Sequence, residues 1–204
     1  HVRYIVSRTN RYTGIRYIDD PAIFSWQISN EPRAFSSSEQ DNKDAFAEWI
    51  AESARIIREL DPNHMISTGS EGYYGCEWDM ELCERIHAIE EISYINCHVW
   101  PYNWRWITGD NMVENMQVAF DNTAWYIALH TELGQRINKP VVVEEFGMPR
   151  DGLDFHKGSP SRTQTHSAKR RVRMSCCLCR PTALDVPATC AFRTACPPIR
   201  SAAP

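Results

Sequence analysis

The sequence contains no run of about 18 apolar residues, the length that a helix needs to cross a bilayer. It also lacks the G-x-S-x-G elbow of α/β-hydrolase esterases and the H-E-x-x-H pair of zinc proteases. We therefore expect no membrane partner and neither of these two hydrolase sites. The chain begins at His1 without an initiator Met or the apolar segment of a signal peptide, which indicates a fragment or a processed chain.

Charged residues are unevenly distributed along the 204 residues. Residues 161–204 hold eight Lys or Arg residues and one acid, Asp185, whereas residues 1–160 hold 14 basic and 25 acidic residues. An acidic surface repels phosphate backbones, so we expect no nucleic-acid partner. Because the second segment also loses every strand and helix period, the sequence predicts a folded domain in residues 1–160. It predicts an irregular tail in residues 161–204, disordered or frame-shifted, with a native basic tail as the alternative.

The eight cysteines do not form the pattern of a disulfide framework or of a zinc site. Three of them, an odd number, lie in residues 1–160. In the tail, Cys176, Cys177 and Cys179 are followed by neither a second C-x2-C pair nor a His at ligand distance. We therefore expect free thiols and no metal.

Short apolar segments alternate with segments of helical period in residues 1–160. The expected strands are Ala22–Ser29, Met65–Thr68, Ile92–His98 and Pro140–Glu145, and the expected helices are Asp41–Leu60, Asp79–Ala88 and roughly 112–137. We expect the first strand to be buried on both faces. Strands separated by helices favour right-handed crossovers and a parallel sheet. No G-x-G-x-x-G turn follows a strand, so a (β/α)8 barrel is preferred over a doubly wound sheet.

Polar residues stand at or just after the end of every one of these expected strands. They are Asn30-Glu31, Ser70-Glu71, His98 and Glu144-Glu145. In parallel α/β folds the chemistry lies at the carboxyl ends of the strands. The sequence therefore predicts that these side chains meet in one site.

Two carboxylates at strand ends suit glycoside hydrolysis. One must hand a proton to the leaving oxygen, and the other must attack the anomeric carbon or activate water. Glu31 follows Asn30, whose amide can donate to a sugar hydroxyl, and precedes Pro32, which stiffens the loop. By itself, this Asn-Glu-Pro sequence is equally compatible with an ordinary turn.

The adjacent Glu144 and Glu145 are harder to explain as structural residues. Two neighbouring carboxylates at the end of a buried strand repel each other and lose solvation. Strand alternation sends them to opposite sides, so only one can face a cleft. A helix cap or a salt bridge would explain one of them, and function would explain the other.

Four aromatic rings lie within the segment His98–Trp106, just after an expected strand. Flat aromatic side chains bind the apolar faces of sugar rings, so we expect Trp100 and Trp104 to contact substrate. Trp106 is equally compatible with core packing and with a sugar platform. The other three tryptophans considered are expected to be core residues: Trp26, Trp49 and Trp125.

Six segments, in order, resemble glycoside hydrolase family 5, and most closely its endo-β-1,4-mannanase branch. They are SRTNRYTG (Ser7–Gly14), YIDDP (Tyr17–Pro21), WQISNEPR (Trp26–Arg33), TGSEG (Thr68–Gly72), HVWP (His98–Pro101) and VVVEEFGMPRDG (Val141–Gly152). The resemblance covers about residues 4–160. It implies a partial (β/α)8 barrel, about strands four to seven, because the family's first three strands and its eighth are missing.

This resemblance implies a retaining endo-hydrolase of β-1,4-mannosidic bonds that needs no cofactor. The family's acid/base matches Glu31, and its nucleophile, which precedes an aromatic-Gly pair, matches Glu145. Positions that bind sugar or order the carboxylates match Asn30, Arg33, Glu71 and His98. For retention, we expect the two carboxyl carbons to lie about 5–5.5 Å apart.

Much of the family has Tyr where this chain has Trp100, and a Tyr hydroxyl can orient the nucleophile in a way that an indole does not reproduce. Two alternatives stay open: a β-1,4-glucanase with the same two glutamates, and a non-catalytic or inert glycan-binding fragment. In each case the expected partner is a β-linked polysaccharide or oligosaccharide. We expect a monomer, and a secreted or extracellular location, because polymeric glycans lie outside cells.

Overall fold

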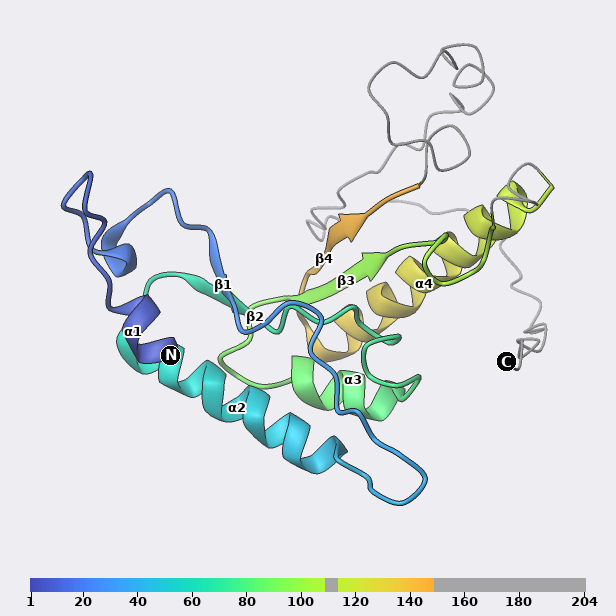
Figure 1. The fold of residues 1–204 in the computed structure, drawn as a ribbon, viewed down its shortest axis with the longest axis horizontal. Coiled ribbons are helices and arrows are strands. Elements are labelled where there is room, and N and C mark those ends of the chain that lie inside the picture. The colour runs from blue at the N-terminus through green and yellow to red at the C-terminus, as the bar shows by residue number, and fades with distance from the viewer. Residues whose placement is uncertain (109–113, 149–204) are drawn as a thin grey trace, which may run out of the picture. The chain divides into compact units, whose positions relative to one another are not determined.

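The computed structural model describes residues 1–108 and 114–148. In chain order they form α1 (Val2–Val6), the 3-10 turn η1 (Tyr17–Asp19), β1 (Ser25–Gln27), α2 (Lys43–Leu60), β2 (Met65–Ser67), α3 (Met80–His87), β3 (Ile95–Val99), α4 (Met116–Ile137) and β4 (Val141–Phe146) (Figure 1). The expected alternation of strands and helices is confirmed. The tail predicted for residues 161–204, and its boundary, lie outside the described residues. None of the helices described has the length and hydropathy needed to cross a membrane.

The four strands are parallel and form two hydrogen-bonded pairs. β1 pairs with β2, with Trp26 opposite Ile66, and β3 pairs with β4. Backbone hydrogen bonds connect the pairs, because the Ser93 amide donates to the Ile66 carbonyl at 2.8 Å and the His98 amide donates to the Glu71 carbonyl at 3.1 Å. α2 packs beside β2, and α4 packs beside β3 and β4. The result is an α/β arrangement of short parallel strands, with the carboxyl ends of the strands at one edge (Figure 1).

β1 is shorter than the expected strand Ala22–Ser29, and the prediction that it is buried on both faces is wrong. At its start Asp20 forms a turn, because its carboxylate accepts a hydrogen bond from the Ala22 amide at 3.0 Å and its carbonyl accepts one from the Ile23 amide at 3.0 Å. Gln27 is exposed. Among the described residues β2 is the one strand that pairs with β1, which leaves the other edge of β1 without a neighbour.

The helices begin and end where local chemistry predicts. Asp79 caps α3, since its carboxylate accepts from the Glu81 and Leu82 amides at 3.0 and 3.1 Å. α4 ends at Asn138, which adopts a left-handed conformation with φ 56°. α2 is amphipathic and buries side chains three to four positions apart. These are Phe46, Ala47, Ile50, Ser53, Ala54 and Ile57.

The prediction that Trp49 and Trp125 are core residues is wrong. Their exposed fractions are 43% and 41%. Both lie at the margin of a buried helix face, where Trp49 stacks on Phe46 with ring centroids 6.3 Å apart. Trp26 is half-buried, and its indole N–H donates to a carboxylate oxygen of Asp61 at 2.7 Å. Helical or strand period alone does not separate the centre of an apolar face from its margin.

Three cysteines lie in the described residues, and all are buried and unpaired: Cys76, Cys83 and Cys97. This confirms the expectation of free thiols for this part of the chain. Burial raises the pKa of Cys97 to about 12, so its thiol stays protonated at neutral pH.

Candidate active site

The end of β1 holds Glu31 beside the chain that follows β2. The Glu31 amide donates to the Gly69 carbonyl at 2.8 Å, and the Ile28 amide donates to the Ser67 carbonyl at 3.1 Å. These bonds continue the parallel pairing past the end of β1. Glu31 has φ 48°, an unusual left-handed conformation for a residue with a side chain, and its side chain is 31% exposed. The backbone therefore aims a partly exposed carboxylate away from β1.

A β-bulge in β4 places the two adjacent glutamates. Cys97 lies opposite Val143, whereas His98 lies opposite Glu145, so Glu144 is the extra residue between them. We expected strict alternation to send Glu144 and Glu145 to opposite sides of the strand. Instead, the bulge brings both carboxylates to one imidazole ring. Glu145 Oε2 lies 3.4 Å from Nδ1 of His98, and Glu144 Oε2 lies 3.8 Å from Nε2.

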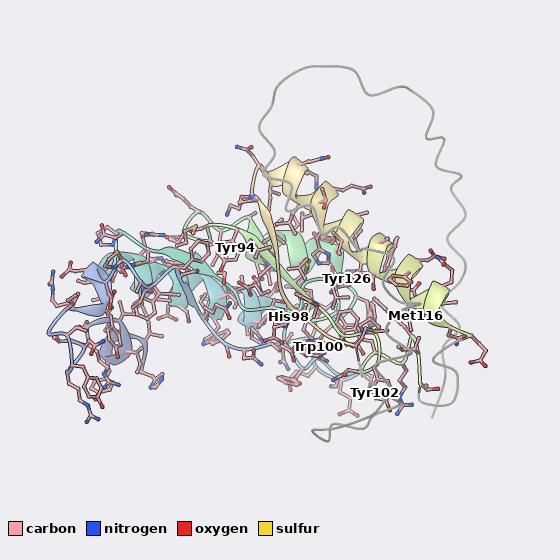
Figure 2. All side chains as sticks on the ribbon, turned by 90° about the horizontal axis from the view of Figure 1, so that it is seen from above. Tyr94, His98, Trp100, Tyr102, Met116 and Tyr126 are labelled. Atoms are coloured by element: carbon pink, nitrogen blue, oxygen red, sulfur yellow. The ribbon has the colours of Figure 1, made fainter. Side chains whose placement is uncertain are left out.

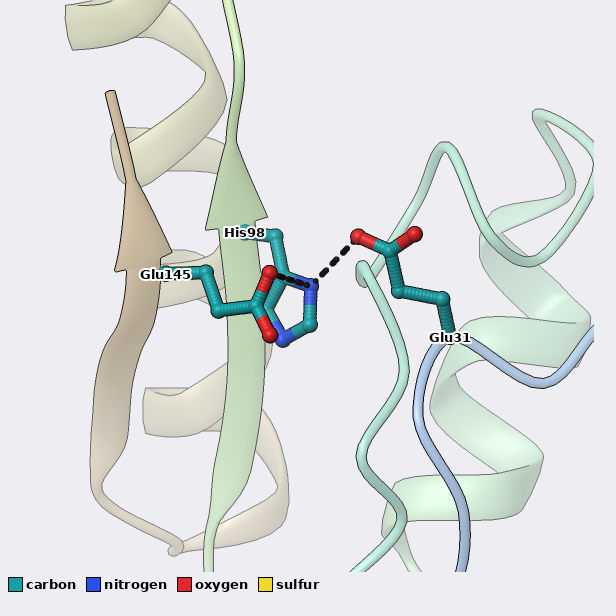
Figure 3. Close-up of side chains that lie close together, drawn as sticks. All are labelled: Glu31, His98 and Glu145. Carbon is teal, nitrogen blue, oxygen red and sulfur yellow. Dashed lines mark hydrogen bonds and ion pairs between the residues drawn. The ribbon is translucent and has the colours of Figure 1, made fainter.

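His98 is the centre of the site and is buried, with 1% of its side chain exposed. Its Nδ1 donates to Oε1 of Glu31 at 2.8 Å and also faces Glu145 (Figure 3). Burial by itself would lower the pKa of His98, but the carboxylates of Glu144, Glu31 and Glu145 together outweigh burial and raise it. The imidazole therefore bridges two strand ends that are separated in the sequence.

Arg33 and Glu71 form a salt bridge beside this centre. Nε of Arg33 donates to Oε2 of Glu71 at 2.8 Å, and the guanidinium lies over the ring of Tyr74, 5.2 Å from its centroid. Glu71 is buried, and burial raises its pKa even though Arg33 acts in the opposite direction. Arg33 is the more exposed partner. The structure thus brings together two of the residues that we expected to bind sugar or order the carboxylates, and Glu71 is the more buried of the two.

Trp100 contacts the Glu145 carboxylate, because its indole N–H donates to Oε2 of Glu145 at 3.3 Å. This differs from the expectation that an indole does not replace the family's Tyr hydroxyl. The ring also packs closely on Gly147, where an added Cβ would lie 2.3 Å from the indole. Figure 2 shows Tyr94, His98, Trp100 and Tyr102 following one another, from the residue before β3 to the loop after it.

Trp104 and Trp106 belong to an aromatic cluster next to the site. Trp104 stacks on Tyr74 with ring centroids 4.7 Å apart and planes 8° apart. Trp106 lies against Trp104 at 5.0 Å, and both rings contact Tyr126. Trp106 therefore packs on the core, and the role expected for Trp104 in sugar binding stays a prediction. Asn30 is exposed beside Glu31, where its amide is free to meet solvent or sugar.

Sequence reasoning missed two tyrosines that support the site. The Tyr94 hydroxyl donates to Oε1 of Glu144 at 2.8 Å. The Tyr126 hydroxyl donates to the Glu71 carbonyl at 2.7 Å and accepts from the Tyr74 amide at 2.9 Å. No local sequence motif marks either tyrosine, because the group that each hydroxyl contacts lies 50 or more residues away in the sequence. The one available signal was a polar atom on an otherwise apolar strand or helix.

Within the described residues, one set of side chains has the spacing of a metal site. Single donor atoms of Glu31, His98 and Glu145 lie within 4.8 Å of one another. Those atoms already partner one another through the imidazole, so a shared proton accounts for the cluster, and we assign no ion to it. Glu31 and Glu145 both approach Nδ1 of His98. Two carboxylates placed in this way suit one acid/base and one nucleophile acting on the same substrate bond.

A model of the family 5 glycoside hydrolases, described as β-mannosidase-like, matches residues 1–170. The chain belongs to glycoside hydrolase family 5. The match includes the segments with Glu31, His98 and Glu145 and so agrees with the resemblance found in the sequence.

Three named proteins are similar over most of this chain. Mannan endo-1,4-β-mannosidase 2 from Oryza sativa subsp. japonica is 29% identical over 165 residues, which are 72% of this chain and 35% of that protein. The family 5 mannosidase from Rhizomucor miehei is 28% identical with a TM-score of 0.64, over 81% of this chain and 35% of that chain. An endo-1,4-β-D-mannanase from Thermotoga petrophila, solved with maltose and glycerol, is 25% identical with a TM-score of 0.57, over 74% and 44%. The chain thus spans about a third of the length of the curated relative.

Proposed function

We propose that this family 5 chain carries the catalytic centre of a retaining endo-β-1,4-mannanase. The observation that carries the proposal is the meeting of Glu31 and Glu145 at His98, from the ends of two strands that do not pair with each other. Similar proteins named as mannan endo-1,4-β-mannosidases and endo-mannanases support mannan as the substrate. We propose that β1 to β4 correspond to strands four to seven of a (β/α)8 barrel.

In this mechanism Glu145 is the nucleophile. Its ionised carboxylate attacks the anomeric carbon while Glu31 gives its proton to the leaving glycosidic oxygen. Water then attacks the glycosyl ester, Glu31 takes the water proton, and Glu145 leaves as a carboxylate. One oxygen of Glu31 and one oxygen of Glu145 lie within 4.8 Å of each other, so both carboxylates can reach the same glycosidic bond.

The surrounding side chains hold these two groups and the sugar. The N–H of Trp100 orients the Glu145 carboxylate, and Nδ1 of His98 orients Glu31. We propose that Asn30 and Arg33, on the same loop as Glu31, donate to sugar hydroxyls, with Glu71 fixing Arg33. We propose Trp104 as a sugar-stacking residue. We also propose that the protein is a monomer and acts on polysaccharide outside the cell.

Two glutamine variants of the 204-residue chain test the mechanism. We expect Glu31→Gln and Glu145→Gln each to lower the release of mannooligosaccharides from galactomannan by about 10²–10⁴-fold. Glu39→Gln is the matched control, since Glu39 is exposed on the loop after Glu31 and should leave turnover unchanged. Exogenous azide added to Glu145→Gly should yield a glycosyl azide of α configuration, because azide replaces the missing nucleophile.

Other outcomes would overturn the proposal. Cleavage of β-1,4-glucan without cleavage of mannan would assign a glucanase. Retention on insoluble mannan without any hydrolysis by the unsubstituted chain would assign a glycan-binding protein.

A further inference from the structure

Glu144 is a buried carboxylate that the proposed mechanism does not use. Its side chain is 10% exposed, and one oxygen, Oε1, accepts the hydroxyl of Tyr94 at 2.8 Å. The other oxygen, Oε2, has no hydrogen-bond partner among the described residues. A buried carboxylate with an unpaired oxygen is costly, so its position needs a physical reason.

The unpaired oxygen faces the second nitrogen of His98. Oε2 of Glu144 lies 3.8 Å from Nε2 of His98, too far for a hydrogen bond but within ion-pair distance. Nε2 also has no hydrogen-bond partner in the part of the chain that the structure describes. The two atoms without partners therefore face each other, and the opposite nitrogen of the ring faces Glu31 and Glu145.

We propose that Glu144, anchored by Tyr94, is a positioning residue that keeps His98 in its charged form, so that the Nδ1–H of His98 stays directed at the Glu31 carboxylate. Only an imidazole with a proton on each nitrogen carries the positive charge that attracts Glu144 on the Nε2 side while Nδ1 donates to Glu31. A neutral ring carries a single proton, on either Nδ1 or Nε2. With the proton on Nε2, Glu31 would have no hydrogen-bond donor from His98. The inference rests on the proposed function for its catalytic consequence, but not for its effect on His98.

Three carboxylates approach the His98 ring from two strands. Glu31 reaches it from the end of β1, and Glu144 and Glu145 reach it from β4. On the β2 side, the backbone carbonyl of Glu71 accepts the His98 amide, while the Glu71 carboxylate is paired with Arg33. Two tyrosines contact these neighbours of the ring. The Tyr94 hydroxyl donates to Glu144, and the Tyr126 hydroxyl donates to the Glu71 carbonyl.

Glu144 is less exposed than the two other glutamates at His98. Glu31 and Glu145 are 31% and 37% exposed and change their proton or bond during the proposed reaction, whereas Glu144 is 10% exposed and takes part in neither step. Its carboxylate therefore stays in place beside His98 when Glu145 becomes an ester and Glu31 exchanges a proton. Glu144 is the carboxylate able to hold the imidazolium through both steps.

Titration of the His98 ring followed by NMR in the 204-residue chain tests this directly. We expect Glu144→Gln to lower the midpoint of His98 by about one unit or more, the effect of removing an opposite charge within 4–6 Å. Glu144→Asp keeps the charge and should recover most of the shift. Glu132→Gln is the control, because it removes the same charge from an exposed site on α4 and should leave the midpoint unchanged.

Hydrolysis gives a second, separate readout. The alkaline limb of the pH profile for mannan hydrolysis should move to lower pH in Glu144→Gln, because His98 then loses its proton earlier. Failure to hydrolyse mannan at all would contradict the proposed function but would leave the NMR result decisive for Glu144.

A His98 midpoint within about 0.3 units of the unsubstituted chain in Glu144→Gln would overturn the positioning role, since an opposite charge this close should shift it more. Tyr94→Phe covers the case in which Glu144→Gln does not fold. Without the hydroxyl, the Glu144 carboxylate loses the hydrogen bond that anchors it beside the ring, and we expect a smaller fall in the His98 midpoint. No fall in Tyr94→Phe would then overturn the inference.

Discussion

Gly69 lies so close to Ser29 that a Cβ added to Gly69 would stand 1.8 Å from the Ser29 carbonyl oxygen. The contact joins the end of β1 to the end of β2, directly beside the bond between the Glu31 amide and the Gly69 carbonyl. Gly69 also has φ 73°, which favours glycine. One close approach of two backbones thus sets the position of Glu31.

We therefore expect Gly69→Ala to lower the free energy of unfolding by well over the roughly 1–2 kcal/mol that a left-handed conformation alone costs. Gly14→Ala is the matched control, because Gly14 has φ 72° but no neighbouring atom within 4 Å of an added Cβ. Urea unfolding of both variants measures the difference. An equal loss of unfolding free energy in the two variants would show that the contact between Gly69 and Ser29 does not restrict the side chain at position 69.

Asp61 is expected to be the most important buried charge for stability. It is fully buried and accepts from the Trp26 indole at 2.7 Å, the His64 ring at 2.6 Å and the Asn63 amide at 2.8 Å. Asp61→Ala should cost about 3–5 kcal/mol, as expected when one member of a buried ionic network is removed. Asp44→Asn, at an exposed salt bridge with Arg85, should cost about 0–1 kcal/mol in the same urea experiment.

The ion pair between Asp61 and His64 makes the free energy of unfolding depend on pH. Burial opposes ionisation of Asp61, but hydrogen bonds from Trp26 and His64 outweigh it and lower its pKa below 3.8. Burial also opposes the charge on His64, but Asp61 and Asp20 raise its pKa above 6.5. The Asp61 contribution is present above pH 3.8 and is lost as pH falls through its lowered pKa. The His64 contribution is present below pH 6.5 and is lost as pH rises through its raised pKa.

Urea unfolding from pH 2 to 9 checks this, with the contribution of the pair expected to be largest between about pH 4 and 6.5. The stability difference between the unsubstituted chain and Asp61→Ala should narrow toward both ends. A difference that is constant across the range would contradict the assignment.

The hydroxyl of Tyr126 should contribute to stability in addition to the packing of its buried ring. The hydroxyl satisfies both the Glu71 carbonyl and the Tyr74 amide within the core. Tyr126→Phe leaves both groups without this partner and should cost about 2–4 kcal/mol, at about 1–3 kcal/mol for each buried group. Tyr4→Phe is a suitable control because Tyr4 is 69% exposed, and thermal or urea unfolding should show a change of at most about 0.5 kcal/mol.

Trp100 provides a test of nucleophile orientation. Trp100→Phe keeps an aromatic ring against Gly147 but removes the N–H that reaches Glu145. We expect the rate of mannan hydrolysis to fall about tenfold, which corresponds to roughly 1.4 kcal/mol and to the loss of one hydrogen bond to a charged group. Unchanged turnover in Trp100→Phe would mean that the indole contributes packing only.

The sequence predicted the strand ends of the site well, for a physical reason. Parallel strands place their carboxyl ends at one edge, so Glu31, His98 and Glu145 were expected together from their positions alone. The bulge at Glu144 was not predictable, because residues on the partner strand decide where a ladder skips a residue. Strict alternation therefore did not predict that both glutamates would reach His98.

Side chains that act at long range were also missed. Tyr94 and Tyr126 contact groups on other elements, and local sequence carries no information about those distances. Trp49 and Trp125 were misplaced for a related reason, since helical period indicates a face but not the neighbour that covers it. The residues that approach the proposed cleft are recognisable from motifs, whereas those that support them depend on the fold.

Covalent trapping tests the central claim most directly. A 2-deoxy-2-fluoro mannosyl donor should form a stable glycosyl ester on the chain, and mass spectrometry of the proteolytic peptides should locate it on Glu145. Glu145→Gln should show no adduct, while Glu144→Gln should still be labelled. An adduct on Glu144 or elsewhere, or an unlabelled chain, would contradict the account in which Glu145 attacks the sugar opposite Glu31.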